Sequence, residues 1–197
     1  MLSERFGFDL AQNRKVLEDW KDLADHVDSL DDAEEVHIAV AGKYTDLADS
    51  YLSVIKALQH ASFKVDRKLV IDWIESSDLD DDAKNTDPES YESAWKLLRE
   101  ADGILVPGGF GIRGIEGKIK AAEYARLNKV PYLGVCLGLQ VATIEFCRNV
   151  LGLEGANSTE FEEEARHQAV IFMPEISKTH MGGTMRLGAK PTPFLVE

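Results

Sequence analysis

The chain has 197 residues, enough for one domain with its own apolar core and a short appended segment. Its formal net charge of −13 argues against nucleic acid and anionic membranes as partners, and no apolar stretch is long enough to span a bilayer. Two cysteines, Cys136 and Cys147, cannot form a disulfide framework and fit a reducing compartment, so we expect a cytoplasmic protein.

The first 35 residues differ from those that follow. Apolar side chains recur at helical spacing and predict an amphipathic helix over residues 9–27, namely Val16, Leu17, Trp20, Leu23, Ala24 and Val27. An acidic stretch over residues 28–35 separates this helix from the rest of the chain. We therefore divide the chain into a linker or docking arm, residues 1–35, and a main domain, residues 36–197.

The main domain alternates strands with helices. We expect strands over residues 36–41, 68–74, 103–106 and 130–135, helices over residues 49–61, 88–101, 115–128 and 139–150, and shorter strands over residues 169–173 and 184–187. This alternation predicts an α/β fold, a three-layer sandwich in which helices cover both faces of a mostly parallel, twisted sheet. We expect the acidic runs at residues 78–82 and 162–164 to be solvated. Ligands bind such sheets at the carboxyl ends of strands, where both glycine-rich loops of this chain lie.

Residues 131–140 carry the strongest functional signal. An apolar run leads into Cys136, with Gly134 two positions before it and Gly138 two positions after it, and a helix follows at once. This is the layout of a nucleophile elbow with cysteine in the place of serine. The sulfur would stand at the amino end of a helix, which favours thiolate, and the N–H of Leu137 could face an oxyanion. The pattern predicts an acyl-transfer nucleophile; the alternative is a small buried cysteine in a glycine-flanked turn.

The second glycine-rich loop, residues 107–114, contains the spacing G-x-G-x-x-G from Gly109 to Gly114. This spacing also occurs in dinucleotide-binding loops, but here it follows the third predicted strand rather than the first. In addition, no acidic residue ends a strand about 20 positions later, where one would hold a ribose. We therefore interpret the loop as a close backbone approach to a ligand, in which Gly109 supplies a second oxyanion donor facing Cys136.

Together with further stretches, these loops make the chain similar to a known family. Residues 107–117, 131–140, 157–161 and 182–188 resemble class I glutamine amidotransferases and, more narrowly, the glutaminase domains of CTP synthases; Gly42, Lys43 and Tyr44 match as well. The whole class shares the elbow, whereas the other stretches are specific to the narrower group. The resemblance implies a flavodoxin-like arrangement of the sheet and makes residues 1–35 the linker from a preceding synthase domain.

The resemblance also implies a reaction. Cys136 would attack the side-chain amide of L-glutamine, the N–H groups of Gly109 and Leu137 would hold the oxyanion, and water would hydrolyse the thioester after ammonia leaves. The residues that would bind glutamine are Gly109, Leu137, Gly138, Leu139, Gln140 and Glu160. The Glu160 carboxylate suits the α-ammonium group of the substrate, and its alternative is a solvent-facing glutamate. Gln140 could equally be an amide on the helix surface.

For the parent enzyme, the resemblance implies that ammonia passes to the synthase domain and replaces O4 of UTP, giving CTP. That step would use ATP and Mg, with GTP as an activator, whereas the domain described by this sequence would need no cofactor and no metal. The family also implies a homo-oligomer, a tetramer, assembled through the synthase domain.

The chain departs from the family pattern at the catalytic base. Class I glutaminases place a histidine in a His-Pro-Glu sequence, and none of His26, His37, His60, His167 and His180 precedes Pro-Glu. Residues 173–175 read Met-Pro-Glu and lie too early in the chain. The family's downstream glutamine-binding arginine is also missing. We therefore expect a truncated domain that is inactive alone.

Two alternatives remain open. The chain could be the class I glutaminase domain of another amidotransferase, such as GMP synthetase or carbamoyl-phosphate synthetase, although residues 157–161 and 182–188 argue against this. It could also bind glutamine or a partner domain without turnover, which the missing base favours.

Overall fold

The computed structural model describes residues 10–43, 45 and 48–172. In chain order its helices and strands are α2 (Leu10–Ser29), β1 (Glu35–Gly42), α3 (Leu52–Lys64), β2 (Lys68–Glu75), α4 (Asp81–Thr86), α5 (Pro88–Glu100), β3 (Gly103–Val106), α6 (Ile115–Asn128), β4 (Tyr132–Gly134), α7 (Leu137–Asn149), β5 (Ala156–Ser158) and β6 (His167–Val170). Short 3₁₀ turns stand between some of them: η1 (Leu30–Asp32), η2 (Ala48–Tyr51) and η3 (Ser76–Leu79).

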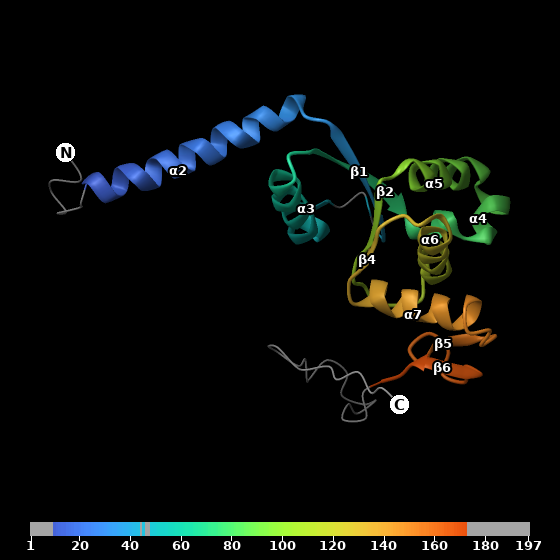
Figure 1. Ribbon diagram of the computed structural model, residues 1–197. Coiled ribbons are helices and arrows are strands. Elements are labelled where there is room, and N and C mark those ends of the chain that lie inside the picture. The colour runs from blue at the N-terminus through green and yellow to red at the C-terminus, as the bar shows by residue number, and fades with distance from the viewer. Residues whose placement is uncertain (1–9, 44, 46–47, 173–197) are drawn as a thin grey trace.

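The first four strands form one parallel sheet in the order β2-β1-β3-β4. Figure 1 shows α3 on one side of this sheet and α5 and α6 on the other. Because all four strands are parallel, their carboxyl ends meet at one edge, and the loops after β3 and β4 emerge there side by side. The predicted fold class, a parallel sheet with helices on both faces, is confirmed.

The core lies where the two central strands meet the helices. All four residues of β3 are buried, as are Ala39, Val40 and Ala41 of β1, because a central parallel strand is covered on both faces. The largest apolar cluster joins these strands to α5, α6 and α7, and includes Leu98, Ile104, Val106, Ile119, Leu137, Val141 and Ile144. The amino end of α7, which begins directly after Cys136, is therefore anchored in the core by Leu137.

Most predicted elements of the main domain are present, with differences at their ends. The helix expected over residues 49–61 is divided into η2 and α3, and β4 is shorter than the expected 130–135. The strand expected over residues 169–173 is β6, which pairs in parallel with β5, a short strand that the sequence did not indicate. The strand expected over residues 184–187 lies outside the described residues.

One acidic run is solvated as expected and the other is not. Glu162, Glu163 and Glu164 are exposed. The prediction for residues 78–82 is wrong in part, because these residues form the end of η3 and the start of α4, and Leu79 is fully buried. Apolar Leu79 pulls the neighbouring backbone against α6, and the Asp80 side chain is half-buried as a result.

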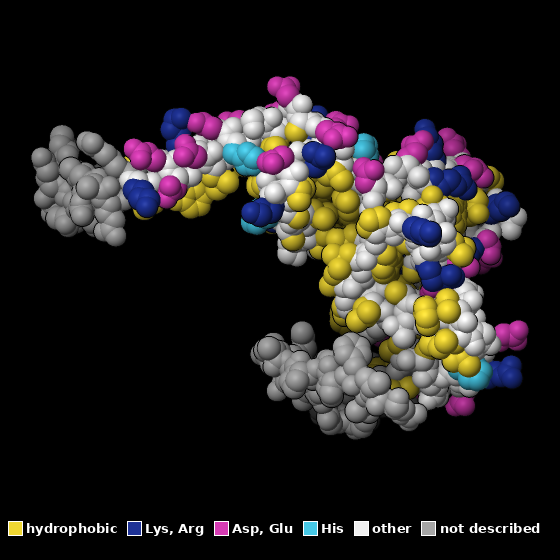
Figure 2. All heavy atoms as spheres, viewed as in Figure 1, with side chains coloured by type: hydrophobic (Ala, Val, Ile, Leu, Met, Phe, Trp, Pro, Cys, Tyr) yellow, Lys and Arg dark blue, Asp and Glu magenta, His cyan; other side chains and the backbone are white. Residues whose placement is uncertain are grey.

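Helix α2 extends from the body of the molecule as an arm (Figure 1). Its apolar stripe is exposed: Trp20 is 66% and Leu17 67% accessible to solvent. Figure 2 shows hydrophobic side chains gathered along one side of this arm. Within the described residues, no helix is long and apolar enough to cross a membrane.

Candidate active site

Cys136 occupies a strained turn between β4 and α7. Its backbone has φ 53° and ψ −106°, outside the regions that L-residues favour, and it is the N-cap of α7. The residue is exposed, so its sulfur is open to a ligand rather than packed in the core. The alternative of a buried cysteine in a turn is thereby contradicted, whereas the strained strand–turn–helix geometry of an elbow is present.

The two glycines that flank Cys136 are required by close packing. A Cβ atom on Gly138 would lie 2.0 Å from the carbonyl oxygen of Val106 in β3, and one on Gly134 would lie 2.5 Å from the backbone of Gly138. Real Cβ atoms do not approach backbone so closely. The elbow therefore sits directly against the neighbouring strand, and only glycine fits at either position.

Hydrogen bonds complete the turn. The Val135 N–H donates to the Val106 carbonyl at 2.9 Å, and the Leu139 and Gln140 N–H groups donate to the Cys136 carbonyl at 3.1 and 3.2 Å. The Tyr132 hydroxyl donates to the Gly138 carbonyl at 2.8 Å. Burial raises the pKa of Tyr132, so this hydroxyl stays protonated and remains a donor.

The glycine-rich loop after β3 faces the elbow. A Cβ on Gly108 would lie 3.3 Å from the Cys136 Cβ and 3.8 Å from its Sγ, so this backbone borders the thiol directly. A Cβ on Gly109 would meet only the Leu137 Cδ2, at 3.6 Å. The two residues expected to donate to an oxyanion, Gly109 and Leu137, are thus neighbours beside Cys136.

The other predicted binding residues differ in their surroundings. Leu137 and Gly138 are buried, so a ligand does not meet the Leu137 side chain at the surface. The Leu139 side chain is 63% exposed, whereas Gln140 is half-buried. These four residues form the first turn of α7, which begins directly after Cys136.

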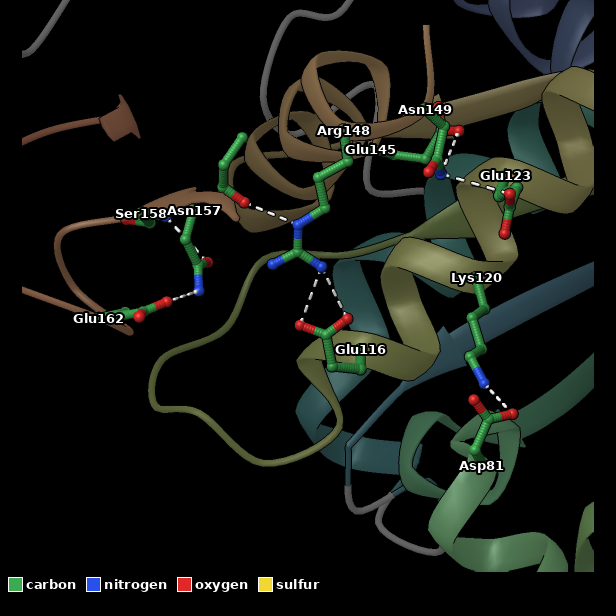
Figure 3. A network of polar contacts seen from close by, with 11 residues as sticks. Asp81, Glu116, Lys120, Glu123, Glu145, Arg148, Asn149, Asn157, Ser158 and Glu162 are labelled. Carbon is green, nitrogen blue, oxygen red and sulfur yellow. Dashed lines mark hydrogen bonds and ion pairs between the residues drawn. The ribbon is translucent and has the colours of Figure 1, made fainter. Parts of the chain in front are cut away.

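Glu160 lies two residues after β5 (Ala156–Ser158), a segment that Arg148 joins to α6, and Figure 3 shows the polar contacts around Arg148. Arg148 at the end of α7 donates from Nε to the Ala156 carbonyl at 2.7 Å and from a terminal nitrogen to both oxygens of Glu116, at 3.1 and 2.8 Å. The Glu160 N–H donates to the Ser158 hydroxyl at 3.2 Å, while its side chain is exposed. Arg148 therefore links the segment that carries Glu160 to the start of α6, directly after the glycine-rich loop.

Charged side chains gather beneath the glycine-rich loop. Arg113 forms an ion pair with Glu75 at 3.4 Å. Burial and the charge of Arg113 lower the pKa of Lys43, while Glu75 and Glu160 oppose that change. Lys118 in α6 is 1% exposed, and its burial and Lys43 lower its pKa to about 8. Several carboxylates among the described residues offset this positive charge: Glu75 pairs with Arg113, Asp78 also interacts with Arg113, and Glu160 interacts with Lys43.

Of the four described histidines, His167 is the first residue of β6, and the other three make their contacts elsewhere. His26 lies 3.0 Å from the Phe63 carbonyl, His37 lies 2.9 Å from Asp72, and the His60 ring packs on Phe63. His180, like residues 173–175 and 182–188, lies outside the described residues. Among the residues that are described, no group of histidine, cysteine and acidic side chains is arranged to hold a metal ion.

Sequence reasoning missed two residues of this site. Gly108, rather than Gly109, is the glycine that packs on Cys136, and its place directly after the proline that ends β3 is a signal that could have found it. Lys43 matched the family only as part of a short stretch, yet its side chain contacts the glycine-rich loop from 67 residues away in the chain.

Comparisons with known proteins agree with this geometry. Residues 46–197 match the family described as "Glutamine amidotransferase class-I". The chain is 56% identical over 188 residues to a CTP synthase of Eremothecium gossypii, covering 94% of this chain and 32% of that protein. It is 56% identical over 178 residues to a CTP synthase of Dictyostelium discoideum, covering 89% of this chain and 31% of that protein, and 52% identical over 183 residues to human CTP synthase 1, covering 93% and 31%.

A solved structure gives the same result for the fold. The chain matches the structure titled "Trypanosoma brucei CTPS - glutaminase domain with bound acivicin" with a TM-score of 0.64 and 43% sequence identity, over 73% of this chain and 53% of that one. The chain spans about a third of the length of the curated relatives it matches. With its family match over residues 46–197, its parallel sheet and its cysteine elbow, the chain belongs to the class I glutamine amidotransferases.

Proposed function

We propose that this chain is the glutaminase domain of a CTP synthase and that it cleaves the side-chain amide of L-glutamine at Cys136. The observation that carries the proposal is the exposed cysteine at φ 53°, at the amino end of α7, with the Gly108 backbone against its sulfur. Identities of 52–56% to CTP synthases support the choice of this group over other amidotransferases of the class.

The reaction follows from this arrangement. The Cys136 thiolate attacks the amide carbon, and the N–H groups of Gly109 and Leu137 stabilise the oxyanion of the tetrahedral adduct. The C–N bond then breaks and ammonia leaves with an added proton, which produces a glutamyl thioester. Water adds to the thioester, the C–S bond breaks, and glutamate is released while the proton returns to the sulfur or its base.

Substrate binding would come from the same loops. Backbone groups of Gly109 and of the turn from Leu137 through Gly138 and Leu139 to Gln140 would border the amide end of glutamine. Glu160, exposed on the segment that Arg148 holds, would accept the α-ammonium group.

The similarity to CTP synthases also supports a proposal for the whole enzyme. Ammonia would pass to a synthase domain of the same polypeptide, which would aminate UTP to CTP with ATP and Mg, and GTP would activate the glutaminase. Residues 1–35, with the exposed α2, would be the linker to that domain, and residues 36–197 the amidotransferase domain. We also propose that this domain itself uses no cofactor, that the whole enzyme is a cytoplasmic homo-oligomer, and that it assembles as a tetramer.

A second candidate function is binding without turnover. It concerns the printed residues taken by themselves: the proton transfers at ammonia and at water need a base, and none of the five histidines in that sequence precedes Pro-Glu. In that case the site would still bind glutamine and form a thioester, but would release glutamate slowly.

The test of the proposed function is the site of covalent labelling. A diazo-ketone analogue of glutamine should label Cys136 much faster than Cys147, because only Cys136 is exposed at a helix amino end. L-Glutamine should protect Cys136 and D-glutamine should not. Mass spectrometry of the digested chain measures both labels; equal labelling of the two cysteines, or label on Cys147 alone, would contradict the proposal.

A further inference from the structure

The backbone of Lys43, directly after β1, is held in place by the side chain of Tyr51. The Lys43 N–H donates to the Tyr51 hydroxyl at 2.9 Å, and the same hydroxyl donates to the Lys43 carbonyl at 2.6 Å. Tyr51 is 9% exposed and its ring packs on Trp73 at 5.4 Å between centroids. A Cβ on Gly42 would lie 2.7 Å from the Tyr51 hydroxyl, so the preceding residue leaves room for this clamp. The Lys43 backbone is therefore held from both sides.

The Lys43 side chain reaches across to the glycine-rich loop. Its Nζ donates to the Phe110 carbonyl at 2.9 Å and to the Gly111 carbonyl at 2.8 Å. These two bonds fix the planes of consecutive peptide groups, directly after Gly109. Lys43 directly follows the last residue of β1 and the loop follows β3, so the contact joins the ends of two neighbouring strands of the sheet.

Few other described residues contact this part of the loop. Phe110 is 88% exposed and Ile112 is 70% exposed, and no atom of the described residues lies within 4 Å of the position of a Cβ on Gly111. At the far end of the loop, the Ile115 N–H donates to the Ile112 carbonyl at a long 3.4 Å. Apolar packing among the described residues therefore contributes little to the position of this segment, whereas the ammonium group of Lys43 supplies two charge-assisted hydrogen bonds there.

We propose that Lys43 is a positioning residue for oxyanion stabilisation, holding the glycine-rich loop so that the Gly109 N–H stays aimed at the adduct on Cys136. This inference rests on the proposed glutaminase function, because it needs an oxyanion to form at Cys136. Lys43 touches neither the sulfur nor the substrate; it acts through the loop. Donors must be in place before charge develops, since reorganising them during the reaction raises the barrier.

The test uses an aldehyde analogue of glutamine, in which the side-chain amide is replaced by CHO. The Cys136 thiol adds to this carbonyl and gives a tetrahedral thiohemiacetal, whose oxygen occupies the place of the oxyanion. With a ¹³C label on the aldehyde carbon, NMR reports both the amount of adduct and the surroundings of that oxygen. Alkylation of Cys136 by iodoacetamide forms no oxyanion and measures access to the thiol alone.

Lys43→Met keeps the length of the side chain and removes its donors. We expect the aldehyde to bind this variant on the order of 10²-fold more weakly, as for other small misplacements of a reacting geometry. The iodoacetamide rate should be unchanged. Lys43→Arg, which keeps the charge and donors, should restore most of the affinity, and Tyr51→Phe, which frees the Lys43 backbone, should weaken binding less than Lys43→Met.

Lys56→Met is the matched control, because Lys56 is an exposed lysine whose Nζ donates to Gln59 on its own helix. This variant should bind the aldehyde as the unchanged chain does. Equal aldehyde affinity in Lys43→Met and the unchanged chain would overturn the inference, as would a parallel loss of iodoacetamide reactivity. If the unchanged chain forms no adduct at Cys136, the proposed function itself fails, which is a different result.

Discussion

The elbow and the glycine-rich loop both border Cys136, but they are held in place by different forces. At the elbow, Gly134 and Gly138 lie so close to neighbouring backbone that no side chain fits. In the middle of the loop, none of the described atoms lies within 4 Å of a Cβ added to Gly111, and two hydrogen bonds from Lys43 supply the restraint. One side of the site is fixed by packing, and the other is adjustable and depends on a few polar contacts.

This difference suits the separate roles proposed for the elbow, which holds the nucleophile, and for the loop, which borders the substrate. A nucleophile must be held in a strained turn that unrestrained backbone would relax, and close packing against β3 provides that restraint. A loop that admits and then surrounds a substrate needs fewer contacts, since regions of low contact density are the ones that open locally. The far end of the loop is nonetheless packed: a Cβ on Gly114 would lie 3.0 Å from the Ser77 amide nitrogen.

The largest effect is expected at the elbow. Gly138→Ala would place a Cβ 2.0 Å from the Val106 carbonyl, and the helix would have to move away from β3. We expect a loss of about 3 kcal/mol or more in the free energy of unfolding, at or above the upper end for overpacked sites. Urea unfolding followed by circular dichroism measures this loss; a change below about 1 kcal/mol would show that the elbow is not closely packed in solution.

The next effect is expected on the reaction rather than on stability. Gly109→Ala meets only a flexible atom of Leu137 at 3.6 Å, so the fold should tolerate it. A disturbed oxyanion donor typically costs about 3–4 kcal/mol in the barrier, so glutaminase activity in a full-length enzyme should fall by on the order of 10²–10³-fold. An unchanged rate would remove Gly109 from the site, and a large loss of stability would mean that the loop is packed like the elbow.

A smaller effect is expected from Asp80, whose ionisation makes the free energy of unfolding depend on pH. The Asp80 carboxyl faces Gly117 in α6, and burial raises its pKa from 3.8 to about 6. Because the folded state binds this proton more tightly than the unfolded state, Asp80 destabilises the fold above pH 6, and the destabilisation is relieved as pH falls from about 6 toward 4. Asp80→Asn should therefore raise the free energy of unfolding at pH 7.5 by at most about 3 kcal/mol.

The control for Asp80 is the pH dependence itself. Nearby Lys120, Glu116 and Asp82 also influence this carboxyl, so the gain from Asp80→Asn should be measured at pH 7.5 and pH 4.5. The gain should shrink at the lower pH. A gain of the same size at both pH values would show that the substitution acts by packing and not through ionisation.

The smallest effect is expected in the middle of the loop. Gly111 has φ 78°, a left-handed conformation, but an added Cβ would have no atom within 4 Å in the part of the chain that the structure describes. Gly111→Ala should cost only the backbone strain, about 1 kcal/mol, in contrast to Gly138→Ala. Thermal unfolding of both variants measures their losses of stability: Gly111→Ala adds only backbone strain, whereas Gly138→Ala adds only a steric clash. Equal losses in the two variants would contradict the proposed difference between the loop and the elbow.

The sequence predicted the core of this fold well because the buried parallel strands are continuous apolar runs. Residues 103–106 are β3 and residues 115–128 are α6, with the bounds expected. The elbow was also predictable, since two glycines at fixed spacing around a cysteine meet one steric requirement. Each of these features depends on residues that are near in the chain.

The features that were not predicted depend on contacts between distant residues. The burial of Asp80 follows from the packing of Leu79 and η3 on α6, whereas a run of acidic residues indicates a solvated loop. The Lys43 contact joins two strand ends that become neighbours only when the sheet forms. Strand β5 has three residues, too few for a hydrophobic period.

The most direct measurement of the central claim, that Cys136 is the nucleophile of a glutaminase, is glutamate release in a coupled assay. It compares the chain as printed, a chain extended by a His-Pro-Glu segment from a class I relative, and the extended chain with Cys136→Ser. We expect the extended chain to turn over glutamine, the printed chain to release glutamate on the order of 10²–10⁴-fold more slowly for want of a base, and the serine variant to be inactive. Equal rates for the printed and extended chains, or turnover that survives Cys136→Ser, would contradict the account.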